Sequence, residues 1–379
     1  MRPVSRIVAG AFAACTFSAG FYVLTAILLR RWLRASPIPR RDGFEPVTFF
    51  RPIKSGEPHL DEDLARFLGG LEPGDQVLIG TDNEKDLGLC KTLVAKCAVP
   101  DATCLHCVPD LHENPKVSKL ARMESLARHE RWIILDSDTR PDRLFLQGFR
   151  SEWEASGADA LSSPYAFSDW ETRAARLDAI GTSLSLWPGA ALLRAVGRVD
   201  FLTGACMGIK APFLRSRGGW RILGSALADD YELGRLVRQA GGRIHLASTC
   251  LSLRAGKMDA SAWFFHQHRT FATFRICNPW GSLGLPLTHG VAVSFVLALG
   301  KPRSLFRWAF HALLLALRMA CGNSLPSAAP RPRPACVWLV SLLEPVFWLS
   351  SWLFPRVRWG GKNWNRPKKI PIAPRRIAP

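Results

Sequence analysis

Acidic residues are absent from long stretches at both ends of this 379-residue chain. Residues 1–41, 301–333 and 355–379 hold seven, six and eight Lys and Arg residues respectively, and no Asp or Glu. The formal net charge is +19, so the central residues 42–300 are close to neutral. Because the basic charge flanks apolar segments, it fits a membrane protein that meets an anionic lipid surface and argues against a nucleic-acid partner.

Residues 7–29 lack any charged side chain and are numerous enough to cross a bilayer. Five Arg residues follow this run before residue 42, whereas only Arg2 and Arg6 precede it. This asymmetry predicts that the next domain faces the cytoplasm. Together with the C-terminal apolar segments described below, it leads us to expect a multi-pass membrane protein. A cleaved signal peptide is the alternative, but the run is long and its basic residues follow it, so we favour an uncleaved anchor.

Two common cofactor signatures are also missing. The chain contains no GxGxxG segment, which excludes the usual dinucleotide fingerprint. The Cys104-Leu-His-Cys107 pair has no second CxxC partner, so it gives little support to a zinc site and also fits a short strand. We expect the ten scattered cysteines to stay reduced in a domain that faces the cytoplasm.

Apolar runs alternate with helical patterns in the first half of the central region. Strands are expected at 47–50, 76–80, 102–108 and 132–135, and helices at 60–68, 87–97 and up to residue 126. This alternation predicts an α/β fold with a parallel sheet covered by helices.

Three apolar segments follow, at residues 285–299, 305–321 and 335–354. The first is a short candidate span. In the second, Arg307, His311 and Arg318 share one helical face, which favours an interfacial amphipathic helix. The third is a fair span that contains Glu344, which is either functional or simply faces a neighbouring helix at a Pro kink. An even number of spans after the domain keeps the basic tail on its side, and we expect two.

The segment Ile133-Ile-Leu-Asp-Ser-Asp-Thr-Arg-Pro141 ends an apolar run in two carboxylates, Asp136 and Asp138. It predicts a buried strand that delivers acids at its carboxyl end, where open α/β sheets bind ligands. Carboxylate oxygens suit a hard divalent cation that is shared with a diphosphate. An Asp-rich turn that caps the next helix is the alternative. Asp230 also opens a helix, where an acid can be a structural cap.

Further segments accompany this pair in order along the chain: Arg51-Pro-Ile-Lys54, Gly80-Thr-Asp82, Asn114-Pro-Lys116-Val-Ser-Lys-Leu120, Leu202-Thr-Gly-Ala-Cys-Met207 and Leu227-Ala-Asp-Asp-Tyr231. Together they resemble the ceramide glucosyltransferase family, which includes bacterial glycosyltransferases associated with hopanoid biosynthesis. The resemblance covers residues 45–280. It implies a GT-A (nucleotide-diphospho-sugar transferase) domain of the α/β class, with N- and C-terminal transmembrane or interfacial helices.

With this resemblance, we expect four regions: an N-terminal anchor and basic linker at 1–41, a GT-A domain at 42–280, C-terminal membrane-associated helices at 281–354, and a basic cytoplasmic tail at 355–379.

The resemblance also implies roles for individual residues. Asp82 would contact the nucleotide base region. Asp136 and Asp138 would bind the nucleotide and a Mg²⁺ or Mn²⁺ ion, with Asp138 the more direct ligand. Asp230 would be the general base, and Arg269 would hold the leaving diphosphate.

Two positions remain open. Lys116 is interpreted as a phosphate contact, with an exposed loop lysine as the equal alternative. The family motif around Arg269 would have Arg or Gln at position 266 and Trp at position 270, where this chain has His266 and Thr270. The neighbouring Trp263, Phe264 and Phe265 are interpreted as interfacial anchors.

The implied reaction is the transfer of a hexose or N-acetylhexosamine from a UDP-sugar to a hydroxyl of a membrane lipid, with inversion. Ceramide or another sphingolipid is one acceptor type and a hopanoid is another. A polysaccharide-extending enzyme and a catalytically impaired scaffold that retains the fold are the alternatives. The sequence does not indicate an oligomeric state.

Overall fold

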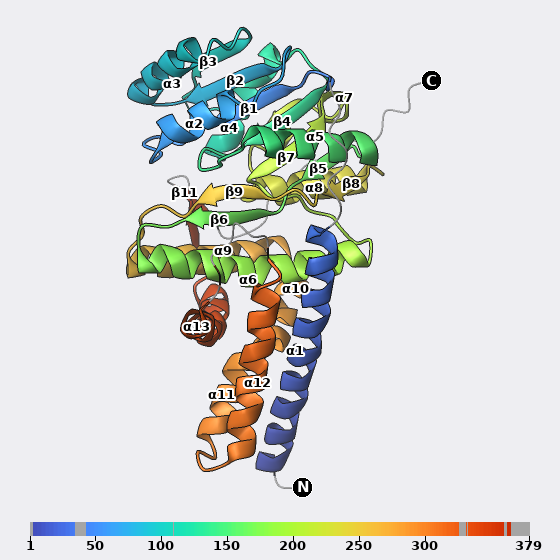
Figure 1. The fold of residues 1–379 in the computed structure, drawn as a ribbon, viewed down its shortest axis with the longest axis vertical. Coiled ribbons are helices and arrows are strands. Elements are labelled where there is room, and N and C mark those ends of the chain that lie inside the picture. The colour runs from blue at the N-terminus through green and yellow to red at the C-terminus, as the bar shows by residue number, and fades with distance from the viewer. Residues whose placement is uncertain are drawn as a thin grey trace.

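The computed structural model describes residues 3–34, 43–108, 110–325, 331, 333–359 and 362–364. The expected linker at 37–41 and residues 365–379 of the expected basic tail lie outside the described residues. Figure 1 shows an α/β domain at one end of the molecule and a bundle of apolar helices at the other, with long helices lying between them.

A sheet of seven strands, counted over the described residues, forms the centre of the α/β domain, in the order β3-β2-β1-β4-β7-β5-β8. Its strands are β1 (Thr48–Pro52), β2 (Gln76–Thr81), β3 (Ala102–His106), β4 (Arg131–Leu135), β5 (Ala160–Ser162), β7 (Cys206–Lys210) and β8 (Ile244–Leu246). The first four strands are parallel, which confirms the predicted α/β architecture. Strand β7 runs antiparallel to both β4 and β5, and apolar periodicity did not reveal that direction.

Both faces of the sheet are covered by helices, because successive side chains of a strand point to opposite faces. Phe49 packs with α2 (Leu60–Leu68), α3 (Glu84–Lys96) and α5 (Arg143–Ser156), and its ring lies 5.2 Å from that of Phe67. Phe50 packs on the other face with α4 (Pro115–Met123), α7 (Ala211–Arg215) and α8 (Asp229–Gln239). Strands β1 and β2 are buried along their whole length and have apolar centres, whereas Thr48, Arg51, Gln76 and Thr81 near their ends are buried polar exceptions.

A second layer faces the apolar helices (Figure 1). Strands β6 (Tyr165–Asp169) and β9 (Leu251–Arg254) form a separate parallel pair. Each strand leads into a long helix, α6 (Arg173–Ala195) after β6 and α9 (Ala260–Cys277) after β9. This layer therefore joins the α/β domain to the apolar helices.

The apolar region consists of α1 (Pro3–Leu33), α10 (Pro279–Gly284), the 3-10 helix η3 (Leu285–Thr288), α11 (Gly290–Leu299), α12 (Leu305–Gly322) and α13 (Pro334–Leu353), and a small hairpin follows, β10 (Val357–Trp359) with β11 (Lys362–Trp364). Within the described chain, three helices are long and apolar enough to cross a membrane: Ser5–Leu33, Leu305–Gly322 and Pro334–Leu353. The bent pair Pro279–Thr288 and Gly290–Leu299 would be a fourth span if it crosses as one unit.

Helix α12 differs from the interfacial helix that its sequence predicts. It runs alongside α1 and α11 in Figure 1, whereas α13 is seen almost end-on. Its polar face is turned toward neighbouring helices: Arg307 Nη1 donates to the Leu297 carbonyl at 2.7 Å, and His311 Nδ1 lies 3.0 Å from Ser294 Oγ. Polar side chains that find partners inside a bundle need not face lipid headgroups.

Glu344 of α13 faces neighbouring helices, which is the second of its two interpretations. It is 3% exposed, pairs with Arg318 of α12 and accepts a hydrogen bond from Ser185 of α6 at 2.9 Å. The ion pair therefore joins α12 to α13, and the Ser185 hydrogen bond joins α13 to α6.

Candidate functional site

The Asp136–Asp138 turn directly follows the carboxyl end of β4. The side chain of Arg51, on the neighbouring strand β1, binds the backbone of this turn. Arg51 is fully buried, and its Nη2 donates to the carbonyls of Thr139 at 2.7 Å and Ser137 at 3.4 Å. The side chain of Asp136 is 33% exposed. The turn backbone is thus fixed while its carboxylates remain accessible.

The turn carries excess negative charge. Burial raises the pKa of Asp138 to about 7, the charges of Asp136 and Glu57 add to this rise, and Arg51 opposes it. Glu57 is half-buried, and its Oε2 accepts a hydrogen bond from Ser137 Oγ at 2.7 Å. Sequence reasoning missed Glu57; the only signal was an acid in the Ser-Gly-Glu-Pro turn directly after β1.

Lys116 lies between two carboxylates at the start of α4. Its Nζ is 2.7 Å from Asp136 and 3.2 Å from Asp229, and the side chain is only 15% exposed. Asn114 caps the helix by accepting from the Val117 amide at 3.1 Å, which fixes the backbone that carries Lys116. Burial lowers the pKa of Lys116, but the surrounding carboxylates outweigh this effect and raise it overall. Lys116 is therefore a charged partner of the acids and not an exposed loop lysine.

Asp230 joins the same cluster from the first turn of α8. Burial raises its pKa to about 6, Asp229 adds to the rise, and Lys116 opposes it. A Cβ atom added to Gly204 would lie 3.0 Å from Asp230 Oδ2 and 3.7 Å from Asp136 Oδ2. The two carboxylates therefore converge over a glycine that leaves room for them. Asp230 Oδ1 also accepts from the adjacent Tyr231 amide at 2.8 Å, which helps to fix its side chain.

Asp82 lies at the end of β2 and already has partners. Its Oδ1 accepts from Lys119 Nζ at 2.9 Å and from Ser55 Oγ at 2.7 Å. Burial alone would raise the pKa of Asp82, but the bonds from Lys119 and Ser55 lower it overall. Asp82 is thus a fixed, ionised acid near the same sheet edge as Asp136.

Arg269 lies on α9, one of the long helices between the α/β domain and the apolar helices (Figure 1). Burial lowers its pKa, and Asp178 of α6 partly offsets this effect. Asp178 also lies 2.7 Å from His266 Nδ1 and accepts from Gln267 Nε2 at 2.9 Å. In the described parts of the chain, no hydrogen bond or ion pair connects Arg269 to Asp136 or Asp230.

Tyr165, at the start of β6, is under the electrostatic influence of both groups of acids and was not predicted from the sequence. Burial raises its pKa, and the charges of Asp230, Asp138 and Asp178 add to this effect. Its ring packs edge-on against Trp187 of α6 at 4.9 Å, and Trp187 lies 6.3 Å from Trp32 of α1. Aromatic contacts therefore connect the start of β6, through α6, to the first apolar helix.

The aromatic triplet of α9 fulfils only part of its expected interfacial role. Phe264 and Phe265 are 41% and 66% exposed, as an anchor requires. Trp263 is 8% exposed and packs on Phe347 of α13 at 5.7 Å, so it belongs to the interior. On a helix, adjacent residues point about 100° apart, and they rarely share one surface.

A divalent cation fits this site only together with a phosphate-bearing substrate. Over the described residues, no group of three or more His, Cys, Asp or Glu side chains could hold a metal ion, and this includes Cys104 and Cys107. Asp136 and Asp138 supply two carboxylates with excess negative charge. Mg²⁺ and Mn²⁺ accept such a pair and fill their other positions with phosphate oxygens and water.

The fold is that of a GT-A glycosyltransferase. It aligns with the mannosyltransferase PcManGT from Pyrobaculum calidifontis, solved in complex with GDP-Man and Mn²⁺, with a TM-score of 0.59 over 92% of this chain and 98% of that one. The identity is 15%, so the likeness concerns the fold alone.

The family model of glycosyl transferase family 21 matches residues 11–368. The chain belongs to this family, the ceramide glucosyltransferase family, and is a glycosyltransferase. A ceramide glucosyltransferase from Komagataella phaffii (strain GS115 / ATCC 20864) is 27% identical over 117 residues, which cover 29% of this chain and 23% of that protein. The matched region thus spans less than a quarter of that relative.

Proposed function

We propose that the protein transfers a hexose or N-acetylhexosamine from a UDP-sugar to a hydroxyl group of a membrane lipid, with inversion at the anomeric carbon. One observation carries this proposal: Asp136, Lys116 and Asp230 converge around Gly204, and apolar helices adjoin the same domain. The family supports a lipid acceptor, and the proposal is that this lipid is of the ceramide (sphingolipid) or hopanoid type.

The donor diphosphate is assigned to the Asp136–Asp138 turn. Both carboxylates would hold Mg²⁺ or Mn²⁺, which when bound neutralises charge on the leaving diphosphate. Lys116, only 3.2 Å from Asp229 and closer to Asp136, adds positive charge at the same place. Asp82, fixed by Lys119, is assigned to the nucleotide base region. PcManGT, with GDP-Man and Mn²⁺ bound, supports this class of donor and cation.

The acceptor is assigned to Asp230 as general base. Asp230 takes the proton of the lipid hydroxyl while that oxygen bonds to the anomeric carbon and the bond from this carbon to the diphosphate breaks. A pKa of about 6 leaves Asp230 ionised at neutral pH yet basic enough to accept the proton. A single displacement needs one such base and inverts the anomeric configuration, unlike a two-step route with a carboxylate nucleophile.

Arg269 and the layer of α6 and α9 are assigned to the membrane side of the site. Arg269 would meet the leaving diphosphate once the donor is bound. The amphiphilic acceptor would reach Asp230 from the leaflet along this layer. Arg30 and Arg31 lie in the last turn of α1, next to the α/β domain, which favours a domain that faces the cytoplasm.

The experiment uses membranes that contain the protein, a panel of radiolabelled UDP-sugars, and Mg²⁺ or Mn²⁺. Label is counted in the lipid extract for wild type, Asp230→Asn and the exposed control Asp61→Asn on α2. We expect transfer by wild type and the control, and at least a hundredfold less by Asp230→Asn. Label in a water-soluble polymer would favour chain extension, and no transfer by folded protein would favour the scaffold.

A further inference from the structure

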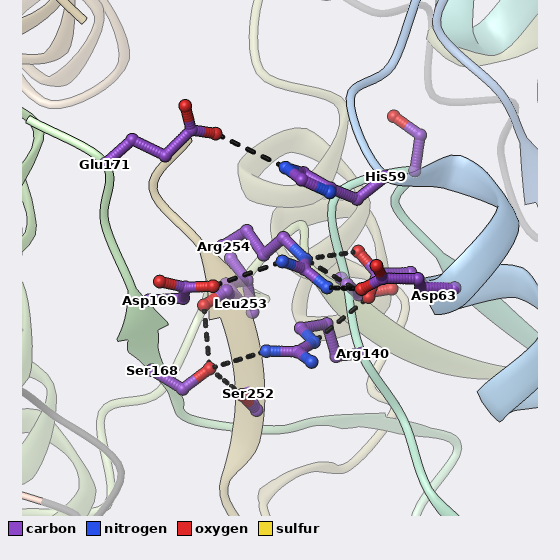
Figure 2. A network of polar contacts seen from close by, with 12 residues as sticks. His59, Asp63, Arg140, Ser168, Asp169, Glu171, Ser252, Leu253 and Arg254 are labelled. Carbon is purple, nitrogen blue, oxygen red and sulfur yellow. Dashed lines mark hydrogen bonds and ion pairs between the residues drawn. The ribbon is translucent and has the colours of Figure 1, made fainter. Parts of the chain in front are cut away.

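Asp63 of α2 is a buried carboxylate that binds two arginines from different parts of the chain (Figure 2). Its side chain is 2% exposed. Its oxygens accept from Arg254 Nε at 3.1 and 3.3 Å, and Oδ1 lies 3.0 Å from Arg140 Nε. A buried carboxylate with two cationic partners is fixed in place, because moving it would leave charge uncompensated.

Both arginines belong to segments that pair through their backbones directly beside Asp138. The Arg254 amide donates to the Asp138 carbonyl at 3.3 Å, and the Arg140 amide donates to the Ser252 carbonyl at 2.9 Å. Thr139, between them, forms an antiparallel bridge with β9. The chain that leaves the Asp136–Asp138 turn is therefore joined to β9 before it reaches α5.

The same network reaches the layer formed by β6, β9, α6 and α9. Arg254 Nη1 donates to Asp169, at the end of β6, at 3.1 Å. His59 Nε2, just before α2, lies 3.3 Å from Glu171, just before α6 (Figure 2). Three parts meet at Asp63: the helix after β1, the turn that carries Asp138, and the strand pair that leads into α6 and α9.

We infer that Asp63 is a positioning residue of the transferase site: through Arg140 and Arg254 it fixes the turn of Asp138 relative to the strand pair β6–β9. The inference rests on the proposed function, which assigns the donor to this turn. Asp63 is the only acid paired with Arg140 among the described residues, whereas Arg254 also pairs with Glu62 and Asp169. Loss of the Asp63 charge therefore acts mainly on Arg140, two residues from Asp138.

The effect concerns geometry, because Asp63 itself touches no substrate. A donor site must be held to about half an ångström to be productive, and a misplacement of about 1 Å costs on the order of a hundredfold in rate. A loosened Asp138 turn should therefore weaken cation binding and lower kcat together.

The test compares Asp63→Asn with Asp61→Asn, an exposed acid two residues earlier on the same helix. Free Mn²⁺ is counted by electron paramagnetic resonance during titration of purified protein with UDP present, which requires no turnover. We expect about fivefold weaker Mn²⁺ binding and at least tenfold lower kcat for Asp63→Asn. The control should match wild type in both measurements.

Arg140→Gln provides a second variant if Asp63→Asn does not fold, because the Arg140 side chain is partly exposed and easier to replace. It should show the same joint loss. Folded variants with wild-type Mn²⁺ affinity and kcat, whatever their melting temperature, would overturn the inference alone. A wild-type protein that neither binds Mn²⁺ with UDP nor transfers sugar would overturn the proposed function and the inference with it.

Discussion

Replacement of Asp138 by Asn should stabilise the protein while it removes activity. Burial and the charges of Asp136 and Glu57 raise the pKa of Asp138 from 3.8 to about 7. Between about pH 4 and pH 7, Asp138 is therefore protonated in the folded protein and ionised in the unfolded chain. Stability falls as the pH rises through this window, and above pH 7 the wild type carries the full cost of the carboxylate.

The size of this cost follows from the shift. About three pKa units correspond to about 4 kcal/mol. Asp138 is partly accessible to solvent and shares its charge interactions with Asp136, so we expect about half of this value, roughly 2 kcal/mol. For a chain of 379 residues that is a rise of about 2–3 °C in melting temperature.

The assay is thermal unfolding of purified protein in detergent with EDTA, at pH 8 and at pH 4.5. Asp138→Asn should melt about 2–3 °C above wild type at pH 8, and the difference should shrink to about a quarter of this at pH 4.5, where Asp138 of the folded protein is protonated. Mn²⁺ with UDP should stabilise wild type but not the variant. A variant that melts below wild type at pH 8, or a difference that is independent of pH, would refute the electrostatic account of this turn.

Other predictions follow from the same structure. The kcat/KM of wild type should rise with pH through about 6, as Asp230 loses its proton. Asp230→Asn should lose this pH dependence and about a hundredfold or more in kcat, and an unchanged pH profile would contradict the role of Asp230 as base. Gly204→Ala should place a Cβ 3.0 Å from the Asp230 carboxylate and lower kcat about tenfold in folded protein, and full activity would show that this carboxylate need not stay in place. Arg318→Met should leave Glu344 buried without its cation and cost about 3–5 kcal/mol of folding stability. The double variant Arg318→Met/Glu344→Gln should recover most of the melting temperature, and an equal loss of melting temperature in both variants would show that the pair is not coupled.

The fold was predictable from sequence to the extent that it depends on local pattern. The apolar runs that became β1, β2 and β4 are separated by helical segments, and such alternation nearly always forms a parallel sheet. The direction of β7 and the separate pair β6–β9 were not predictable, because strand pairing depends on contacts between distant segments.

The candidate site was also predictable only in part. The resemblance pointed to Asp136, Lys116 and Asp230, which the structure brings together. Asp63 was not predicted, because an acid in the first turn of a helix is also favoured by the helix dipole. Glu57 was not predicted either, because its proximity to Asp138 arises only when the loop after β1 folds over the turn after β4.

The polar face of α12 shows a further limit of sequence patterns. His311 and Arg318 share one helical face, and the same spacing fits a helix on a membrane surface and a helix in a bundle. Only the partners distinguish the two cases, and here the partners are Ser294 and Glu344 on neighbouring helices.

The central claim is a metal-dependent transfer of sugar from a nucleotide donor to a lipid, with Asp230 as base. The most direct measurement uses purified protein in liposomes that contain ceramide or a hopanoid, with UDP-sugars labelled in the sugar, followed by mass analysis of the lipid product. We predict a glycolipid with inverted anomeric configuration from wild type with Mg²⁺ or Mn²⁺, and none from Asp230→Asn or with EDTA. A product formed equally well by Asp230→Asn, or one with retained configuration, would contradict the account.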